Sequence, residues 1–152
     1  MLLVKTKILP SKIHGLGLFA DQLIPKGTEI WRFTPGIDLK LTREEILALP
    51  ELAQICAYTY GYRSKKSGLY IYSSDGARHI NHSDDPNSYS EYKDSEEEAV
   101  TVALKDIQPG EEILDNYNSF EFATSEGDVL DEIAEKYHLT GDDIDPRLAP
   151  AQ

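Results

Sequence analysis

The chain has 152 residues, of which 40% are hydrophobic and 28% are charged, and its formal net charge is −12. This length and composition predict a single globular domain, and no apolar run is long enough to span a membrane. The negative charge argues against nucleic-acid phosphate as the main partner, because such binding requires Lys and Arg to neutralise phosphates. The charge favours a basic partner or serves only to keep the protein in solution, and composition leaves both open.

The N-terminal segment and the single cysteine limit the cellular setting. Residues 1–7 lack the basic segment, the long apolar segment and the small-residue cleavage site of a signal peptide, so we expect a cytoplasmic or nuclear protein. Cys56 alone excludes an internal disulfide and a multi-cysteine zinc cluster within the chain. Next to Ile55 and Ala57, it is expected to be a small core residue rather than a nucleophile.

The first forty residues predict strands and turns. Val4, Thr6 and Ile8 alternate with lysines, which is the period of a half-buried strand. Glycine and proline mark the turns that separate the later strands. The expected strands are 4–8, 16–19 and 29–33, with turns at 24–28 and 35–36.

A helical insertion is predicted over about residues 42–57. Thr42-Arg43-Glu44-Glu45 is a capping box, in which the threonine caps the first turn and Glu45 reaches back. Ile46, Leu47 and Leu49 would give the helix an apolar face, and Pro50 limits it. A second short helix is expected over 52–57.

The rest of the chain returns to strands and ends in a helix. Residues 93–98, Lys-Asp-Ser-Glu-Glu-Glu, predict a solvated hairpin tip. From Ser125 to His138 the apolar residues follow helical spacing, with acids early where the helix dipole favours them. The acidic tail beyond is expected to fray. The expected strands are 69–72, 88–92, 99–104 and 112–114. The whole pattern predicts a mostly β fold.

The densest motif is residues 78–87, Arg-His-Ile-Asn-His-Ser-Asp-Asp-Pro-Asn. Turn formers this dense usually mark a solvated loop, but Ile80, two histidines and an arginine indicate a half-buried turn that holds something. A metal site is conceivable here, although Pro86 and the turn formers argue against the helix that a histidine-pair motif requires. The conceivable ligands are His79, His82, Asp84 and Asp85.

Two other motifs have plain structural explanations when taken singly. Gly15-Leu16-Gly17-Leu18-Phe19-Ala20 fits the dinucleotide-binding pattern G-x-G-x-x-A, but Pro25 and Gly27 follow too soon for the helix that this fingerprint needs. Two explanations of this motif remain: a tight turn, or a loop whose backbone approaches a ligand. Residues 110–117 predict a turn and a strand whose terminal tyrosine packs on a sheet.

Taken in order, these motifs resemble those of SET-domain protein-lysine N-methyltransferases. Gly15-Leu16-Gly17 resembles the family's G-x-G motif, residues 78–87 its Arg-Phe-x-Asn-His-Ser-Cys-x-Pro-Asn motif, and residues 110–117 its Gly-Glu-Glu-Leu-x-x-Asp-Tyr motif. The resemblance runs from about Val4 to about Phe122. It implies a β-clip-like fold of several small sheets with a pseudoknot, formed where the chain after Gly110 threads past residues 78–87, and a domain over 1–123 followed by a C-terminal helix and acidic tail over 124–152.

The resemblance also implies a site and a reaction. S-adenosyl-L-methionine, without a metal, would donate a methyl group to the lysine amine of a basic protein, histone-like or other, that enters through a narrow channel from the opposite face. Tyr117 would be catalytic and orient the amine. The implied cofactor-binding residues are Gly15, Leu16, Gly17, Arg78, Asn81 and His82, with Phe120 and Phe122 as candidates to cover the adenine. The channel candidates are Tyr58, Tyr60, Tyr62 and Tyr72. The first three are two positions apart, so on a strand they would share one face.

The chain departs from the family pattern at a few positions. Asp84 replaces a cysteine and no cysteine cluster follows Tyr117, so the family's post-SET zinc site should be missing. Asn116 replaces an aspartate and His79 a phenylalanine. Two other functions are kept beside the main one: a catalytically weak SET-like module that binds basic partners through its acidic surface, and a metal-dependent hydrolase built on His79, His82 and Asp84. The sequence leaves open the target lysine, the number of methyl groups transferred, the location at host chromatin, a homodimer and the role of the last helix.

Overall fold

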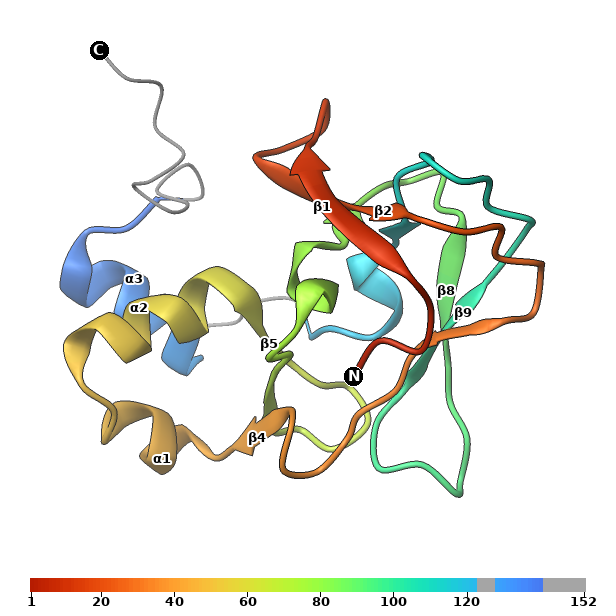
Figure 1. Cartoon of the computed structure of the whole chain (residues 1–152). Helices are drawn as coiled ribbons and strands as arrows, with labels where there is room; N and C mark the ends of the chain where they lie inside the picture. The colour runs from red at the N-terminus through yellow and green to blue at the C-terminus, as the bar shows by residue number, and fades with distance from the viewer. Residues whose placement is uncertain (123–127, 141–152) are drawn as a thin grey trace, which may run out of the picture.

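The computed structural model describes residues 1–122 and 128–140. Ten short strands form four small sheets in this part of the chain, and the helices lie together at one side of the molecule (Figure 1). The strands are β1 (Thr6–Pro10), β2 (Leu16–Ala20), β3 (Glu29–Trp31), β4 (Leu39–Leu41), β5 (Gly61–Arg63), β6 (Tyr70–Tyr72), β7 (Asn81–His82), β8 (Ser88–Glu91), β9 (Val100–Ala103) and β10 (Leu114–Asp115). The helices are α1 (Arg43–Leu47), α2 (Glu51–Tyr60) and α3 (Val129–Tyr137), with 3₁₀ turns η1 (Gly76–His79) and η2 (Tyr117–Ser119). The predicted mostly β class is confirmed.

The sheets are antiparallel with one exception. The orders are β1-β2, β3-β9-β8 and β4-β6-β5, and the fourth sheet pairs β7 with β10 in parallel. Its register places Leu114 beside Asn81 and Asp115 beside His82. No described helix is long and apolar enough to cross a membrane.

On its other side, the strand β10 is held by Asn87. The Asn87 Nδ2 donates to the Glu112 carbonyl oxygen at 2.7 Å, and the Leu114 N–H donates to the Asn87 Oδ1 at 2.8 Å. The Ser88 hydroxyl also donates to the Leu114 carbonyl oxygen. The segment 112–115 thus runs between β7 and residues 87–88, which is the threaded arrangement that the resemblance implies.

Two main hydrophobic clusters support this arrangement. The first lies under the β-strands, and its buried members are Leu18, Ala20, Ile24, Ile30, Ala103, Ile107 and Ile113. The second joins the helices, with buried members Ile46, Ala57, Tyr70, Val129, Leu130 and Ile133. Because α3 contributes half of the second cluster, it packs into the same body as the inserted helices.

The helical region confirms some predictions and corrects others. The capping box is present: the Thr42 hydroxyl accepts from the Glu45 N–H, and the Glu45 carboxylate accepts from the Thr42 N–H. The second helix runs to Tyr60 rather than ending at residue 57, so Tyr58 and Tyr60 lie on a helix and not on a strand. Cys56 is exposed on this helix, so the prediction of a core cysteine is wrong. The predicted helix start at Ser125 and the tail from residue 141 lie outside the described residues.

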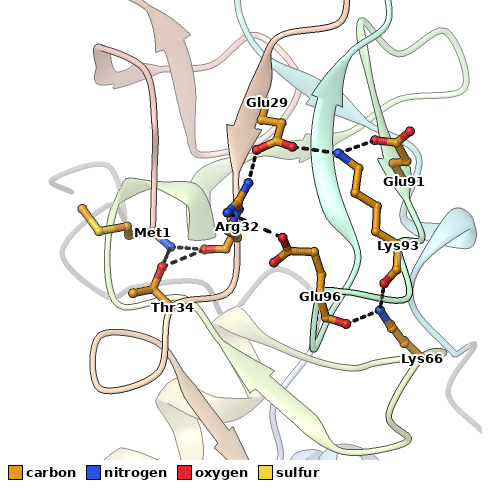
Figure 2. A network of polar contacts seen from close by, with 8 residues as sticks. All are labelled: Met1, Glu29, Arg32, Thr34, Lys66, Glu91, Lys93 and Glu96. Atoms are coloured by element: carbon orange, nitrogen blue, oxygen red, sulfur yellow. Dashed lines mark hydrogen bonds and ion pairs between the residues drawn. The ribbon is translucent and has the colours of Figure 1, made fainter.

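The predicted hairpin tip at residues 93–98 is more firmly tied down than its charges suggest. Lys93 reaches Glu29 on β3 at 2.7 Å and Glu91 on β8 at 3.0 Å, and the Lys66 ammonium donates to the backbone oxygens of Lys93 and Glu96 (Figure 2). The prediction of a solvated tip is wrong for Glu98, which is 1% exposed. Its carboxylate accepts from the Ser64 hydroxyl and lies 2.9 Å from the Lys40 ammonium.

Candidate functional site

Two adjoining cavities share part of their walls. We call the first the tyrosine cavity, with a volume of about 260 Å³, and the second the loop cavity, with a volume of about 390 Å³. Four residues line both: Thr59, Tyr60, Arg78 and Tyr117. The tyrosine cavity also contacts Tyr58, Tyr62, Ser90, Thr101, Asp115, Phe120 and Glu121. The loop cavity also contacts Ile13, His14, Leu16, His79, Asn81 and His82. Tyr117 therefore stands where the two cavities meet.

The glycine-containing loop before β2 is fastened to the rest of the site by Asn81. The Asn81 Nδ2 donates to the carbonyl oxygens of His14 and Leu16, both at 3.1 Å, and to the Glu112 Oε1 at 2.8 Å. Gly15 has a φ of +46°, which only glycine adopts without strain. The amide thus fixes the loop backbone at the edge of the loop cavity.

The Glu112 carboxylate also contacts the residues that hold this loop. Its Oε2 accepts from the Ser11 hydroxyl at 3.0 Å, while its Oε1 accepts from Asn81. A Cβ atom at position 17 would lie 2.1 Å from the Oε1, so the absence of a side chain at Gly17 makes room for this carboxylate. The second glycine of the motif serves the packing of Glu112.

Tyr117 is held by the 78–87 motif at both ends of the residue. Its N–H donates to the His82 Nδ1 at 3.2 Å, and its hydroxyl donates to the Ile80 carbonyl oxygen at 2.6 Å. The ring also makes edge contacts with His82 and Phe120, with centroids 5.3 and 5.7 Å apart. Burial raises the pKa of Tyr117 to about 12, and the charges of Glu121 and Asp115 add to the rise. The hydroxyl therefore stays protonated at neutral pH.

Two carboxyl groups line the tyrosine cavity in the described part of the chain. Asp115 is 2% exposed, and burial raises its pKa to about 6 in spite of the hydrogen bond from the Asn116 N–H and the neighbouring hydroxyls of Ser88 and Ser90, which lower it. Burial raises the pKa of Glu121 to about 7; the charge of Asp128 raises it further and Lys65 lowers it. Cavities that hold perturbed carboxyls beside aromatic rings are typical of functional sites.

The structure brings four of the eight expected cofactor residues to the loop cavity. Leu16, Arg78, Asn81 and His82 line it, while Gly15 and Gly17 flank Leu16 without lining it. The two phenylalanines expected to cover an adenine lie elsewhere. Phe120 is in the wall of the tyrosine cavity, 4.9 Å from the Tyr62 ring centroid. Phe122 packs against the Arg63 guanidinium and lines neither cavity.

The expected channel tyrosines separate into two groups. Tyr58, Tyr60 and Tyr62 line the tyrosine cavity, and Tyr60 also lines the loop cavity. Tyr72 lines neither; it lies on β6, paired with Leu39 and Gly61. Burial raises the pKa of Tyr62 far above its usual value.

Several residues of the site were not expected from the sequence. Glu112 stands inside the recognised 110–117 motif, where its side chain could have been assigned a role. Asp115, at the end of an apolar strand, carried the signal of a buried carboxyl. Thr59 and Glu121 gave no such signal. Thr59 reaches both cavities from the last turn of α2, and Glu121 reaches the tyrosine cavity through its pairing with Ser64.

The metal-site alternative finds no ligand set in the structure. The His82 Nε2 lies 3.5 Å from an oxygen of Asp84, whose side chain is almost fully exposed. In residues 1–122 and 128–140, no three His, Cys, Asp or Glu side chains gather closely enough to hold a metal ion. The structure therefore gives the hydrolase hypothesis no support.

Comparison with known proteins identifies the class of this fold and site. The sequence profile of the SET domain matches residues 15–118, which span all three motifs. The chain therefore belongs to the SET-domain family. No curated protein matches the sequence.

Solved structures show the same fold. A Plasmodium falciparum protein assigned as a histone methyltransferase is 24% identical with a TM-score of 0.54; the match covers 76% of this chain and 95% of the other. A humanized mutant of the Chaetomium thermophilum Polycomb Repressive Complex 2, bound to an inhibitor, is 21% identical with a TM-score of 0.56 over 77% of this chain and 15% of that one. The complex ctPRC2, autoinhibited and bound to S-adenosylmethionine, is 19% identical with a TM-score of 0.58 over 89% of this chain and 17% of that one.

Proposed function

We propose that this protein transfers a methyl group from S-adenosylmethionine to the side-chain amine of lysine in a basic protein. The observation that carries the proposal is the meeting of two cavities at Tyr117 in a chain of the SET-domain family. One cavity would hold the methyl donor and the other the amine. A reaction that joins two ligands needs this geometry, because holding them in line removes the entropic cost of their encounter.

The residues of the loop cavity fit the methyl donor. The cavity volume of about 390 Å³ lies within the range of cofactor sites. The Arg78 guanidinium in its wall suits the carboxylate of the donor's amino-acid part. The rings of Tyr60 and His79, with centroids 5.5 Å apart, offer aromatic surface for the adenine. The donor supplies a methyl group activated by a sulfonium, and we assign Asn81 and Glu112 to hold the loop beside it.

The tyrosine cavity fits the lysine side chain. Tyr62, Tyr117 and Phe120 supply aromatic walls for its aliphatic stem and for its cationic head. Since the Tyr117 hydroxyl donates to the Ile80 carbonyl oxygen, its lone pairs are free of that bond and can accept an N–H from the amine. Tyr117 would thereby orient the amine toward the loop cavity. A substrate rich in lysine also complements the net charge of −12.

The direct test is methyl transfer by the full chain. Tritiated S-adenosylmethionine is incubated with the protein and with core histones, other purified basic proteins and a lysine-rich peptide, and cofactor binding is measured by calorimetry. We expect cofactor binding and label on lysine of at least one acceptor. Absence of both would refute the enzymatic function. Peptide binding that needs no cofactor, together with no transfer, would favour the binding-module alternative.

A further inference from the structure

Glu121 lies in the wall of the tyrosine cavity, and its backbone is hydrogen-bonded to neighbouring segments. Its N–H donates to the Tyr117 carbonyl oxygen at 2.9 Å, and it forms an antiparallel bridge with Ser64. The residues on both sides of it are hydrogen-bonded to the segment 63–65 at 2.9 Å. The side chain of Glu121 therefore starts from a fixed position close to Tyr117.

The Glu121 carboxylate is half-buried and has no hydrogen-bond donor or ion-pair partner among residues 1–122 and 128–140. The nearby Lys65 ammonium instead donates to the Asn118 carbonyl oxygen at 2.6 Å. Asp115 differs, because its carboxylate accepts from the Asn116 N–H at 2.7 Å and from serine hydroxyls. The Glu121 oxygens are not among the fully buried unpartnered atoms of the described residues, so this carboxylate is only partly shielded from water. In the cavity wall it is open to a ligand that brings a hydrogen-bond donor.

The proposed reaction needs a proton acceptor in this cavity. A lysine amine has a pKa of about 10.4 in water, so it arrives as an ammonium and must lose one proton before it can attack. Burial raises the pKa values of Tyr62 and Tyr117, so both keep their protons at neutral pH, and an arginine cannot accept a proton. Among the described groups of the wall, the carboxyls of Asp115 and Glu121 remain, and that of Glu121 is the one without donors.

We propose that Glu121 accepts the proton of the incoming ammonium, an inference that rests on the proposed function. One N–H bond of the ammonium breaks and an O–H bond forms on the carboxylate, which leaves a neutral amine and a neutral carboxylic acid. The nitrogen lone pair is then available for attack on the methyl group. The acid returns its proton to water before the next turnover. No oxidant, metal or further reactant enters this step.

The charges around Glu121 favour such a role. Burial together with the charge of Asp128, the residue that caps α3, raises the pKa of Glu121 to about 7, while Lys65 lowers it. A base is most effective when its pKa lies near the working pH. Asp128 is itself within 3.7 Å of the Arg63 guanidinium. The other titratable or charged groups of the same wall are Tyr58, Tyr60, Tyr62, Arg78, Asp115 and Tyr117.

The first test compares the pH dependence of turnover in two variants of the full chain. Glu121→Gln removes the proton acceptor and keeps the size of the side chain. Glu44→Gln removes the same charge from an exposed position on α1 and is the control. With the best acceptor protein of the transfer assay, we expect wild-type kcat/KM to rise with an inflection near pH 7. E121Q should be about 100-fold slower at pH 7.5, lack the inflection and recover toward pH 9.5, where solvent deprotonates the amine.

The second test reads the carboxyl group itself and needs no turnover. The ¹³Cδ resonance of Glu121, assigned by its loss in E121Q, is titrated with and without n-butylammonium chloride. We expect a midpoint near pH 7 alone and a lower one with the amine, because a nearby cation favours the ionised form.

The two tests separate this inference from the proposed function. The role of Glu121 is overturned if E121Q keeps the wild-type inflection, or if the titration midpoint of the Glu121 resonance does not change with the amine. In either case, methyl transfer by the wild type would still support the proposed function. If E121Q only raises KM and leaves the pH profile unchanged, Glu121 serves substrate recognition alone, and its role as proton acceptor is overturned. Failure of the wild type to transfer at any pH would overturn both proposals.

Discussion

Gly17 and Glu112 share one space: the Glu112 Oε1 occupies a position 2.1 Å from where a Cβ of residue 17 would stand. The carboxylate fills this space because Asn81 and Ser11 hold its two oxygens. The glycine of the first motif and the glutamate of the third therefore depend on each other. Asn81 of the second motif closes the group through its bonds to the loop backbone.

Gly17→Ala should displace the Glu112 carboxylate and release Asn81 from the loop. We expect a loss of about 1–2 kcal/mol in unfolding free energy, the usual cost of hydrogen bonds to a charged group. Because the loop forms the edge of the loop cavity, affinity for S-adenosylmethionine should fall about 10-fold, which calorimetry can measure. The control is Gly15→Ala, where a Cβ meets nothing within 4 Å and only the positive φ is strained. It should cost about 1 kcal/mol and leave Glu112 in place; equal effects of both variants on affinity would contradict this role of Glu112.

Tyr117→Phe should separate catalysis from folding. The variant removes the hydroxyl that donates to the Ile80 carbonyl oxygen at 2.6 Å and keeps the ring contacts with His82 and Phe120. We expect a stability loss of about 1 kcal/mol, cofactor affinity near that of the wild type, and turnover about 100-fold lower, as for the loss of one preorganised polar group. Single-turnover transfer assays measure the last effect. Tyr89→Phe, at an exposed tyrosine of β8, is the matched control. Unchanged turnover in Y117F would remove Tyr117 from the role assigned to it.

Asn87→Asp should weaken the threaded segment. The Asn87 amide donates to the Glu112 carbonyl oxygen and accepts from the Leu114 N–H, so it acts like a strand partner of that segment. An aspartate at this buried position keeps the acceptor but sets a second oxygen against the Glu112 carbonyl. We expect a loss of about 2–3 kcal/mol, the cost of a buried charge or polar group without its donor. Chemical denaturation measures it. The same change at the exposed Asn118, whose side chain is not used in this way, should have little effect.

Local features of this fold could be predicted from the sequence, because their causes are local. The capping box at Thr42 and Glu45 needs only residues three apart. The alternating and turn-forming residues predicted the bounds of most strands to within a few residues of those observed. The exposure of Cys56 and the burial of Glu98 were not predictable in this way, since both depend on which distant element covers them. Glu98 is buried because Ser64 and Lys40 reach it from other strands.

The site shows the same division. The ordered motifs named Arg78, Asn81, His82 and Tyr117, and the structure gathers these residues around the two cavities. The placement of Phe120 with the tyrosines rather than at the loop cavity follows from the pairing of Lys65 with Phe120, a contact between segments 55 positions apart that no spacing encodes. Glu121 enters the wall through the same pairing. Site residues that depend on such long-range contacts can be identified only from the folded structure.

Asp115→Asn should stabilise the protein in a pH-dependent manner. Burial raises the pKa of Asp115 from 3.8 in the unfolded chain to about 6 in the folded one, so the folded state binds the proton more tightly. This contribution to stability is complete below pH 3.8 and is lost as the pH rises through 6. Above that range the ionised carboxylate costs the wild type up to about 3 kcal/mol relative to a neutral side chain.

The measurement is unfolding free energy by urea denaturation between pH 4 and 8. The difference between D115N and the wild type should grow in favour of D115N across this range and level off near neutral pH. Glu121 titrates higher, at about 7, so the Glu121→Gln variant should diverge from the wild type later in the same series. Asp94→Asn, at an exposed residue of the hairpin tip, makes the same change of net charge and should follow the wild type throughout. A constant gap between D115N and the wild type would mean that Asp115 does not titrate in this range, and that the Asn116 N–H and the neighbouring serines stabilise its carboxylate more than burial destabilises it.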